Sequence, residues 1–408
     1  MKNLKVKDFV AIGLLISSLI VEFSKNIIAT PLIILWIMLA INDDKKKFKE
    51  YFLSNKKIVI LIYLWMIISF ILYILQNEFM TSYEIKNIFR IAINLLIFGY
   101  YLYYEDKKKL TILLNISLII IMMIGINTII NLIKNPNLSR ILSTANPEKY
   151  YDYVKVSFIG SFGFAYGLIF IIFSIIGIKN FNNITRDNII YITLTLIFTI
   201  TVIYEQFMIS ILLLCIAICL HIFRAYNIKR LLLSALIFSL IFTVFLPSAN
   251  KILKITAKNI KHKAISQRLY EMSNLLENNN LENTVDLKSR VEKYSCSMGT
   301  FLSDPLGLEK EKKIGEHSEI LDEYAKYGLI IASLTVLVFI SYMNFIKKDI
   351  LTQKKTRDIW FINEIVYLIY STINTSMFII TSMMIFFIVP LILKTSEGGN
   401  ENENTLDS

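Results

Sequence analysis

The sequence predicts an all-α, polytopic integral membrane protein. Hydrophobic residues make up 55% of the 408 residues and charged residues 18%, against roughly 45–50% and 25% in soluble domains. Apolar runs recur along the chain at about the 17–25 residues that cross a hydrocarbon core as a helix. Basic residues collect in alternate connections between these runs. These observations argue against a water-soluble enzyme, and they predict one membrane domain over residues 1–393 with a polar tail over 394–408.

Hydropathy predicts about 12 transmembrane helices. The segments 27–41 and 358–373 are short for full crossings, so the number could fall to ten or eleven. The first helix follows three lysines like a signal peptide, but no small-residue cleavage site follows it and a second span comes at once, so we interpret it as uncleaved. In order, the predicted spans cover residues 9–23, 27–41, 58–75, 87–104, 110–133, 155–178, 188–203, 208–223, 231–247, 328–346, 358–373 and 375–393.

The distribution of basic residues predicts the orientation of these helices. With the N-terminus inside, 23 Lys and Arg residues fall in cytoplasmic segments and 5 in the short outer loops. This is the bias of the positive-inside rule, and it places both termini in the cytoplasm and the protein in the cytoplasmic membrane. The net charge of +11 is therefore mostly a topology signal, and it gives no reason to expect nucleic acid as a partner.

The outer connection over residues 248–327 is exceptional, because loops beyond about 12–15 residues are usually functional or disordered. Its first part, Ala249–Leu276, has a helical pattern, and six basic but no acidic residues lie between Ser248 and Arg268. This basic helix fits either an interfacial helix held by anionic headgroups or a platform that faces a lipid-linked diphosphate. The two interpretations are compatible.

Two further short helices are predicted in the same connection. One begins with Asp286 as its N-cap, carries Arg290, and ends at a turn formed by Pro305 and Gly307. The other covers Ser318–Tyr327, immediately before Gly328 and the next span. We therefore expect this connection to be a folded extracytoplasmic unit.

Cysteine and histidine usage argues against a disulfide framework and a metal cage. Cys215 and Cys219 lie within one predicted span, so Cys296 has no partner outside the membrane. Of the three histidines, only His262 and His317 are predicted outside. We expect no metal bound by protein ligands alone and no cofactor.

Two motifs carry a resemblance to a known family. The first runs through the large outer connection, and the second, Gly160-Ser161-Phe162-Gly163-Phe164-Ala165-Tyr166, lies at the outer end of the sixth span. Together they resemble the O-antigen polymerase and ligase superfamily, and most closely capsular and exopolysaccharide polymerases of the Wzy type. The first motif comprises Ser289-Arg290, Tyr294, Pro305-Leu306-Gly307, Gly315-Glu316-His317-Ser318-Glu319-Ile320-Leu321-Asp322 and Tyr327-Gly328.

The resemblance implies a glycosyltransferase that joins oligosaccharide repeat units carried on undecaprenyl diphosphate at the outer face of the membrane. It implies that His317 is the general base on the acceptor hydroxyl and that Arg290 binds the donor diphosphate. The implied partners are the lipid-linked oligosaccharide, the bilayer, a flippase and a chain-length regulator.

The chain departs from the family pattern at one turn. Many relatives show Ser-Arg-Gly between the seventh and eighth spans, where this chain reads Glu205-Gln206-Phe207. A phosphate-binding arginine is therefore missing there. The candidates to replace it, near the predicted outer face, are Arg90, Arg140, Arg268 and Lys155.

The residue types suit the implied chemistry, but each also has a simpler explanation. An Arg offers bidentate stabilisation to a departing diphosphate, and a His near pKa 6.5 can accept a hydroxyl proton. Alternatively, His317 is a solvated loop residue, and Arg290 forms a surface ion pair with Glu292, Asp286 or Glu323. Asp322 follows His317 by five residues, about 140° around a helix if both are helical, which argues against direct orientation of the imidazole.

Two other functions remain open at this stage. An O-antigen-type ligase would move finished glycan from the lipid carrier to another acceptor, and the motifs barely separate it from a polymerase. A polysaccharide transporter or flippase would also have about twelve spans. Transporters often show two related halves, and neither such halves nor a reason for the long late connection is visible in this sequence.

The orientation can be tested by cysteine labelling. We expect a membrane-impermeant thiol reagent to reach Cys296 in intact cells, and to reach a cysteine placed at Lys47 only after the membrane is opened. The converse pattern would contradict the predicted topology, because it would place the segments around Lys45–Lys57 and Lys347–Arg357 outside.

Overall fold

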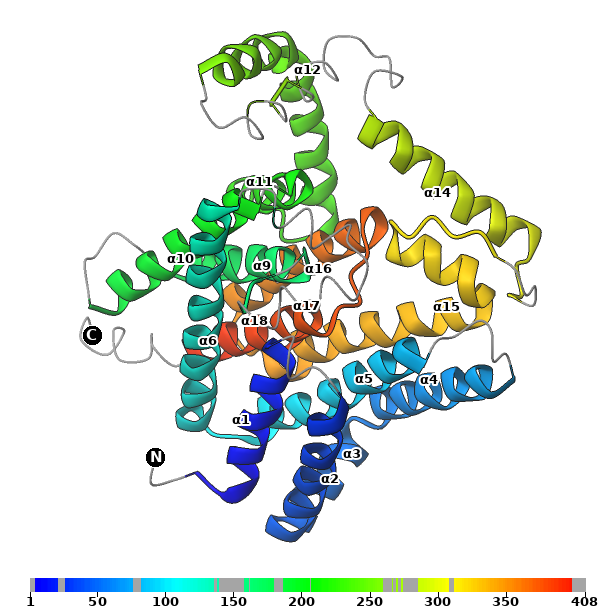
Figure 1. Ribbon diagram of the computed structural model, residues 1–408. Helices are drawn as coiled ribbons and strands as arrows, with labels where there is room; N and C mark the ends of the chain where they lie inside the picture. Colours follow the sequence, from blue (N-terminus) through cyan, green and yellow to red (C-terminus); the bar gives the residue numbers. More distant parts are fainter. Residues whose placement is uncertain are drawn as a thin grey trace.

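The fold is a bundle of helices that cross at varied angles (Figure 1). The computed structural model describes residues 4–20, 26–75, 82–135, 138, 158–160, 162–179, 186–205, 207–259, 266, 269–270, 273, 285–307 and 312–397. Within these residues the regular structure is entirely helical, so the predicted all-α class is confirmed. The helices are α1 (Val6–Leu19), α2 (Asn26–Asp43), α3 (Lys45–Ser54), α4 (Lys56–Leu75), α5 (Ser82–Tyr104), α6 (Lys107–Lys134), α9 (Phe162–Ile178), α10 (Arg186–Glu205), α11 (Met208–Ile222), α12 (Ile228–Asn259), α14 (Val285–Ser303), α15 (Glu319–Phe345), the π-helix η3 (Ile346–Ile350), α16 (Lys354–Ile373), α17 (Ile379–Met383), the π-helix η4 (Met384–Ile388) and α18 (Val389–Ser396).

Six helical stretches in the described part of the chain are long and apolar enough to cross a membrane. Three shorter apolar stretches cover Ala29–Asp43, Phe162–Ile178 and Ile209–Ile222. The six cover Lys56–Ile74, Glu84–Tyr104, Lys107–Lys134, Asn188–Glu205, Glu319–Ile350 and Ile379–Ser396.

Large apolar side chains point outward along the peripheral helices. On α4 the exposed Ile60, Leu64, Ile67 and Ile71 repeat every three or four residues and form one helical stripe. In contrast, almost all of α9 is buried in the centre of the bundle, where it packs against α10, α11 and α16–α18. A helix that presents an apolar stripe outward is suited to a hydrocarbon environment, and a central apolar helix forms the core.

A buried ion network joins helix ends that the sequence assigns to the cytoplasmic side. The Lys7 ammonium lies 2.9 Å from the Glu105 carboxylate and 3.2 Å from that of Asp43. The Lys109 ammonium lies 2.9 Å from Glu105 and 3.1 Å from Asp8. The network therefore ties together the ends of α1, α2, α5 and α6.

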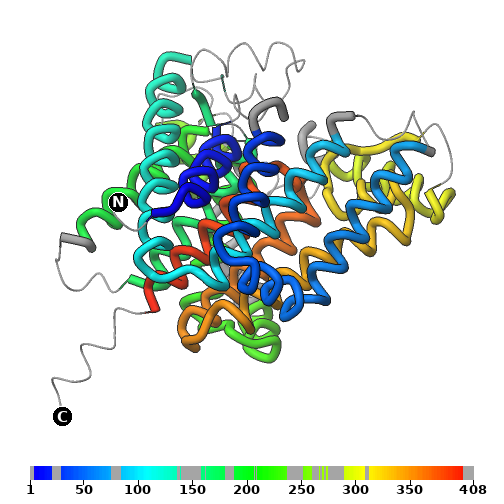
Figure 2. The backbone as a smooth tube through the Cα atoms, turned by 90° about the horizontal axis from the view of Figure 1, so that it is seen from below, coloured from blue at the N-terminus to red at the C-terminus, as the bar shows by residue number. Residues whose placement is uncertain are grey.

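Helix ends that the sequence assigns to the outer side also lie together. The Lys326 ammonium of α15 lies 3.1 Å from the Glu84 carboxylate at the start of α5. α15 packs along α4, and the two helices lie side by side in Figure 2. α14 packs against the beginning of α15 and completes this side of the bundle (Figure 1).

Several predicted boundaries differ from the structure. The span expected to end at residue 247 continues without a break as α12 to Asn259, so the helix includes the first basic residues of the outer connection. α14 begins at Val285, so Asp286 lies in the first turn and is not the N-cap. Residues 375–378, expected to be helical, form a loop before α17, because their backbone groups bind to the start of α15.

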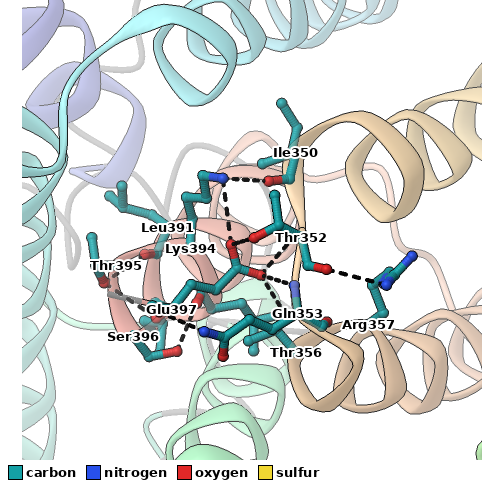
Figure 3. Close-up of polar contacts among 12 residues, drawn as sticks. Ile350, Thr352, Gln353, Thr356, Arg357, Leu391, Lys394, Thr395, Ser396 and Glu397 are labelled. Carbon is teal, nitrogen blue, oxygen red and sulfur yellow. Dashed lines mark hydrogen bonds and ion pairs between the residues drawn. The ribbon is translucent and has the colours of Figure 1, made fainter. Parts of the chain in front are cut away.

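The C-terminal end of the described chain is held by one carboxylate. Glu397 accepts hydrogen bonds from the backbone N–H of Thr352 and Gln353, at 2.8 and 3.0 Å, and from the Thr356 hydroxyl at 2.6 Å (Figure 3). These N–H groups precede α16, where a helix N-terminus favours negative charge. Residues 394–397, expected to begin a polar tail, therefore belong to the packed body, whereas 398–408 lie outside the described residues.

Replacing this carboxylate should destabilise the bundle. Glu397→Gln removes charge-assisted hydrogen bonds, and we expect a loss of about 2 kcal/mol and a lower thermal unfolding midpoint in detergent. Burial alone would raise the pKa of Glu397, but the hydrogen bonds from Thr356, Gln353 and Thr352 lower it overall. The stabilisation by ionised Glu397 is therefore fully present above the ordinary Glu pKa, and it is lost as the pH falls through the lowered pKa of the folded protein. Asp349→Asn, which changes an exposed carboxylate nearby, serves as the control, and equal midpoints for the two variants would contradict the assignment.

Candidate functional site

The two sequence motifs meet through the loop that follows α16. The side-chain amide of Asn374 donates a hydrogen bond to the Tyr166 hydroxyl of α9, at 2.8 Å. The Tyr294 hydroxyl of α14 donates to the carbonyl oxygen of Ile373, at 2.7 Å. The backbone N–H of Glu319 donates to the Asn374 carbonyl, at 3.1 Å. The segment around Asn374 thus connects α9, α14 and the start of α15.

Glu319 strengthens this connection. Its carboxylate accepts hydrogen bonds from the backbone N–H groups of Ser376 and Met377, at 2.7 and 2.9 Å. A carboxylate that accepts two backbone donors holds their loop in one conformation, because charged hydrogen bonds are stronger than neutral ones. Glu319 therefore fixes the loop whose Asn374 contacts Tyr166.

The loop that carries His317 lies directly on the backbone of α14. A Cβ atom at Gly315 would be 2.1 Å from the carbonyl oxygen of Lys293, so only glycine fits. The Gly315 N–H donates to the Ser297 hydroxyl at 2.8 Å. The next residue, Glu316, has a positive φ of 59°, an unusual conformation for a residue with a side chain. This combination brings His317 beside α14.

Asp322 holds the same loop from the other side. Its carboxylate accepts a hydrogen bond from the Ser297 hydroxyl at 2.5 Å and one from the Ser318 N–H at 3.0 Å. The Ser318 side chain caps α15 by accepting from the Leu321 N–H, at 3.2 Å. Asp322 thus positions the backbone around His317 and does not hydrogen-bond the imidazole itself, consistent with the sequence argument.

A crossing of two backbones fixes the start of the loop between α14 and α15. Gly307 and Gly328 have φ of 73° and 71°, and a Cβ on Gly328 would lie 2.4 Å from the backbone of Leu306. The Leu329 N–H donates to the Pro305 carbonyl, at 2.8 Å. The predicted turn after α14 and the predicted break at Gly328 are therefore both present, and the two meet.

His317 is held as a neutral base. Its Nδ1 lies 2.7 Å from the Glu316 carbonyl oxygen, and its Nε2 lies 3.1 Å from the Lys293 ammonium. Burial has the largest effect and lowers the pKa of His317, and the charges of Lys293 and Arg290 lower it further, outweighing the Glu316 carbonyl and Asp322. The imidazole is therefore mostly uncharged at neutral pH.

Arg290 supplies a cation with unused hydrogen-bonding capacity. Its Nη1 atom is buried and has no hydrogen-bond partner among the described residues. Its charge acts on both His317 and the Tyr166 phenol, so it lies within electrostatic range of both motifs. A buried guanidinium nitrogen without a partner is costly, and an anionic ligand would satisfy it.

The α9 motif is part of the packed core. Tyr166 is 1% exposed, and its ring stacks on Tyr370 with centroids 4.5 Å apart. The Gly163 carbonyl accepts from the Thr381 hydroxyl at 2.8 Å, and the Gly160 N–H donates to the Thr128 hydroxyl at 2.7 Å. This motif therefore positions Asn374 through Tyr166.

The other basic candidates have different placements. Arg90 is buried, and its guanidinium donates to the Ser17 carbonyl and hydroxyl, which ties α5 to α1. Arg140, Arg268 and Lys155 lie outside the described residues. At the turn between α10 and α11, Glu205 is buried and the Phe207 ring packs against Tyr166, with centroids 6.3 Å apart.

Sequence reasoning missed Lys293, Ser297 and Asn374. Lys293 follows Arg290 by three residues, which places both on one helix face and was the only available signal. Asn374 gave no signal, because its role depends on contacts with residues about 200 positions earlier in the chain. Among the described residues, no three His, Cys, Asp or Glu side chains are grouped so that they could hold a metal ion.

No protein-family model matches this chain, and no curated protein sequence matches it.

The close contact at Gly315 gives a direct test. In Gly315→Ala the new methyl group would collide with the Lys293 carbonyl. The free energy that holds the loop against α14 should therefore fall by about 1–3 kcal/mol. We expect faster tryptic cleavage after the exposed Lys313, by about fivefold or more, because cleavage follows the population of the open loop.

Gly299→Ala is the matched control, because a Cβ there meets nothing within 4 Å on the same helix. That variant should be as resistant as the unmodified protein, since alanine favours the helix. Equal cleavage of the two variants would show that the loop does not lie on α14.

Proposed function

We propose that the protein is a glycosyltransferase that polymerises oligosaccharide repeat units carried on a lipid diphosphate, such as undecaprenyl diphosphate, into capsule, exopolysaccharide or O-antigen. The observation that carries this proposal is the convergence of Arg290 and the neutral His317 on one surface of α14, with Arg290 Nη1 lacking a partner among the described residues. One group is suited to bind an anionic leaving group, and the other to accept a proton.

The proposed reaction forms one glycosidic bond. The acceptor hydroxyl gives its proton to Nε2 of His317 as its oxygen attacks the anomeric carbon of the donor. The bond between that carbon and the diphosphate oxygen breaks, and the diphosphate leaves with the electron pair. Arg290 stabilises the negative charge that develops on the leaving group, which requires a cation aimed at the phosphate oxygens.

The proposed setting is the outer face of the cytoplasmic membrane, with about twelve crossings and both termini inside. Support comes from the positive-inside pattern and from the way the helix ends group together. The ion network of Lys7 and Lys109 joins segments assigned to the inside, whereas His317 and Asn374 lie among segments assigned to the outside. A flippase that delivers the substrate and a chain-length regulator are the proposed partners.

Reconstitution tests this function against its two alternatives. The purified protein in proteoliposomes, given a lipid-diphosphate-linked repeat unit, should produce longer glycans that remain on the lipid diphosphate. Transfer only to another acceptor would make the protein a ligase. Movement of the lipid-linked unit across the bilayer without any new glycosidic bond would make it a transporter.

Loss of the base should stop elongation. In His317→Ala we expect the rate to fall by about 10²–10⁴-fold while the amount of protein in the membrane stays normal. Ser318→Ala removes only a helix cap, of roughly 1 kcal/mol, and His262→Ala should have little effect. Since neutral His317 is the active form and its pKa is lowered before the donor binds, kcat/KM for the donor should persist below the ordinary His pKa of about 6.5 and fall only at more acidic pH. Wild-type polymer from His317→Ala would rule out this residue as the base.

The contribution of Arg290 to elongation should depend on the geometry of its guanidinium as well as on its charge. Arg290→Lys keeps the charge but loses the two-pronged contact, so we expect transition-state stabilisation to fall by about 1.5–3 kcal/mol. Arg357→Lys, at an exposed arginine that bonds only the Thr352 carbonyl in the described structure, is the control and should keep full activity. If both variants are fully active, Arg290 has only a structural role.

A further inference from the structure

The nitrogen that His317 needs for proton transfer already has a partner. The Glu316 carbonyl can only accept a hydrogen bond, so Nδ1, 2.7 Å away, carries the imidazole hydrogen. Nε2 then holds the lone pair, and the Lys293 ammonium, which can only donate, lies 3.1 Å from it. Lys293 therefore occupies the lone pair that a general base would use.

We propose that Lys293 is a substrate-responsive cap on His317: it blocks Nε2 until the donor binds, and it moves to the donor diphosphate when that group binds Arg290. The inference rests on the proposed function, and it adds the order in which donor binding and acceptor deprotonation occur. The donor must bind before the acceptor hydroxyl can be deprotonated. In this role Lys293 is a positioning residue that acts through His317 and also contacts the donor.

The placement of the two cations allows this exchange. Residues three apart on a helix are neighbours, with Cβ atoms about 5–6 Å apart, so Arg290 and Lys293 can contact one diphosphate group together. The lysine has a flexible stem of four carbons, which lets its ammonium move while α14 stays fixed. An ammonium bonds an anionic phosphate oxygen more strongly than a neutral imidazole nitrogen. The diphosphate should therefore draw Lys293 away from His317.

The surrounding charges favour the same switch. The groups that act on His317 are Lys293 and Arg290 from α14, Asp322 from α15, and the Glu316 carbonyl. Asp322 accepts hydrogen bonds from Ser297 and Ser318, so its carboxylate is committed to the loop. Binding of a diphosphate offsets both α14 cations, and the imidazole becomes more basic when its lone pair becomes free. The base is thus activated only while a leaving group is present.

Chemical modification of His317 tests the cap without any glycan assay. Diethyl pyrocarbonate acylates the free lone pair of a neutral imidazole, and mass spectrometry of the peptide reports the rate for each histidine. Using the full-length purified protein and inorganic diphosphate as the probe, we expect His317 in Lys293→Met to react about tenfold faster than in wild type, as loss of a charged hydrogen bond implies. Diphosphate should accelerate the wild-type reaction and leave that of Lys293→Met unchanged.

Two controls separate this effect from misfolding. Lys313→Met changes an exposed lysine in the loop that carries His317, and in this variant His317 should be modified at the wild-type rate. His221 on α11, whose Nδ1 lies 3.1 Å from the Tyr226 hydroxyl, should react equally in all variants if the fold is intact. If His317 is modified at equal rates in wild type and Lys293→Met, Lys293 does not cap His317. If diphosphate slows the modification equally in both proteins, Lys293 does not move from His317 to the diphosphate.

A second readout distinguishes this proposal from the proposed function. Loss of a neighbouring positive charge raises the pKa of His317 in the protein without donor. In the elongation assay, the acidic limb of the pH profile of kcat/KM for the donor should therefore move to higher pH in Lys293→Met and stay in place in Lys293→Arg. If Lys293→Met is active and the acidic limb of its pH profile stays in place, the proposed role of Lys293 is wrong and the polymerase proposal stands. Absence of elongation by wild type would overturn the polymerase, while the modification rates would still decide the cap.

Discussion

The candidate site depends on one contact between two backbones, where the loop before α15 lies on α14 at Gly315. Because this contact leaves no room for a side chain, the distance between the loop and the helix is set by direct contact of the two backbones and not by side-chain packing. It brings His317 within hydrogen-bond distance of Lys293, and the strained φ of Glu316 turns the imidazole toward α14. Ser297 and Asp322 then hold the loop through hydrogen bonds, and the crossing of Gly307 and Gly328 anchors the start of the loop to α15.

The electrostatics of the site follow from this arrangement. α14 presents two cations to the loop, whereas two carboxylates at the start of α15 are already engaged: Asp322 by Ser297 and Ser318, and Glu319 by the backbone of Ser376 and Met377. The acids therefore build the site, and the cations remain for a ligand. A positive, partly buried surface beside a neutral histidine is suited to a reaction in which an anionic group departs and a hydroxyl loses its proton.

Much of the fold could be predicted from the sequence, but the site could be predicted only in part. Apolar runs located the helices because a long segment buried in hydrocarbon or core must satisfy its backbone hydrogen bonds internally. Gly328 and Pro305-Gly307 marked real breaks because their backbone requirements are local. The end of α12 was missed, because Pro247 at the predicted end of the span is typical of a helix end, whereas the helix continues past it to Asn259. The motifs indicated His317 and Arg290, but Lys293, Asn374 and the structural role of Tyr166 arise from contacts between segments far apart in the chain, which a single sequence does not record. Arg90 was a candidate for phosphate binding because the predicted topology places it near the outer face, and its guanidinium donates to the Ser17 carbonyl and hydroxyl.

The central claim is that α14 and the segment after α16 form one site with His317 and Tyr166, and a photo-crosslink tests it most directly. Benzoylphenylalanine placed at Tyr294, whose hydroxyl lies 2.7 Å from the Ile373 carbonyl, should crosslink on irradiation to the peptide that contains Ile373 and Asn374. The same group at Met298, which is exposed one turn further along α14, should give no such product. The expected result is a crosslink within residues 366–377 from position 294 only. Crosslinking of position 294 solely to lipid, or to other segments of the chain, would contradict the claim.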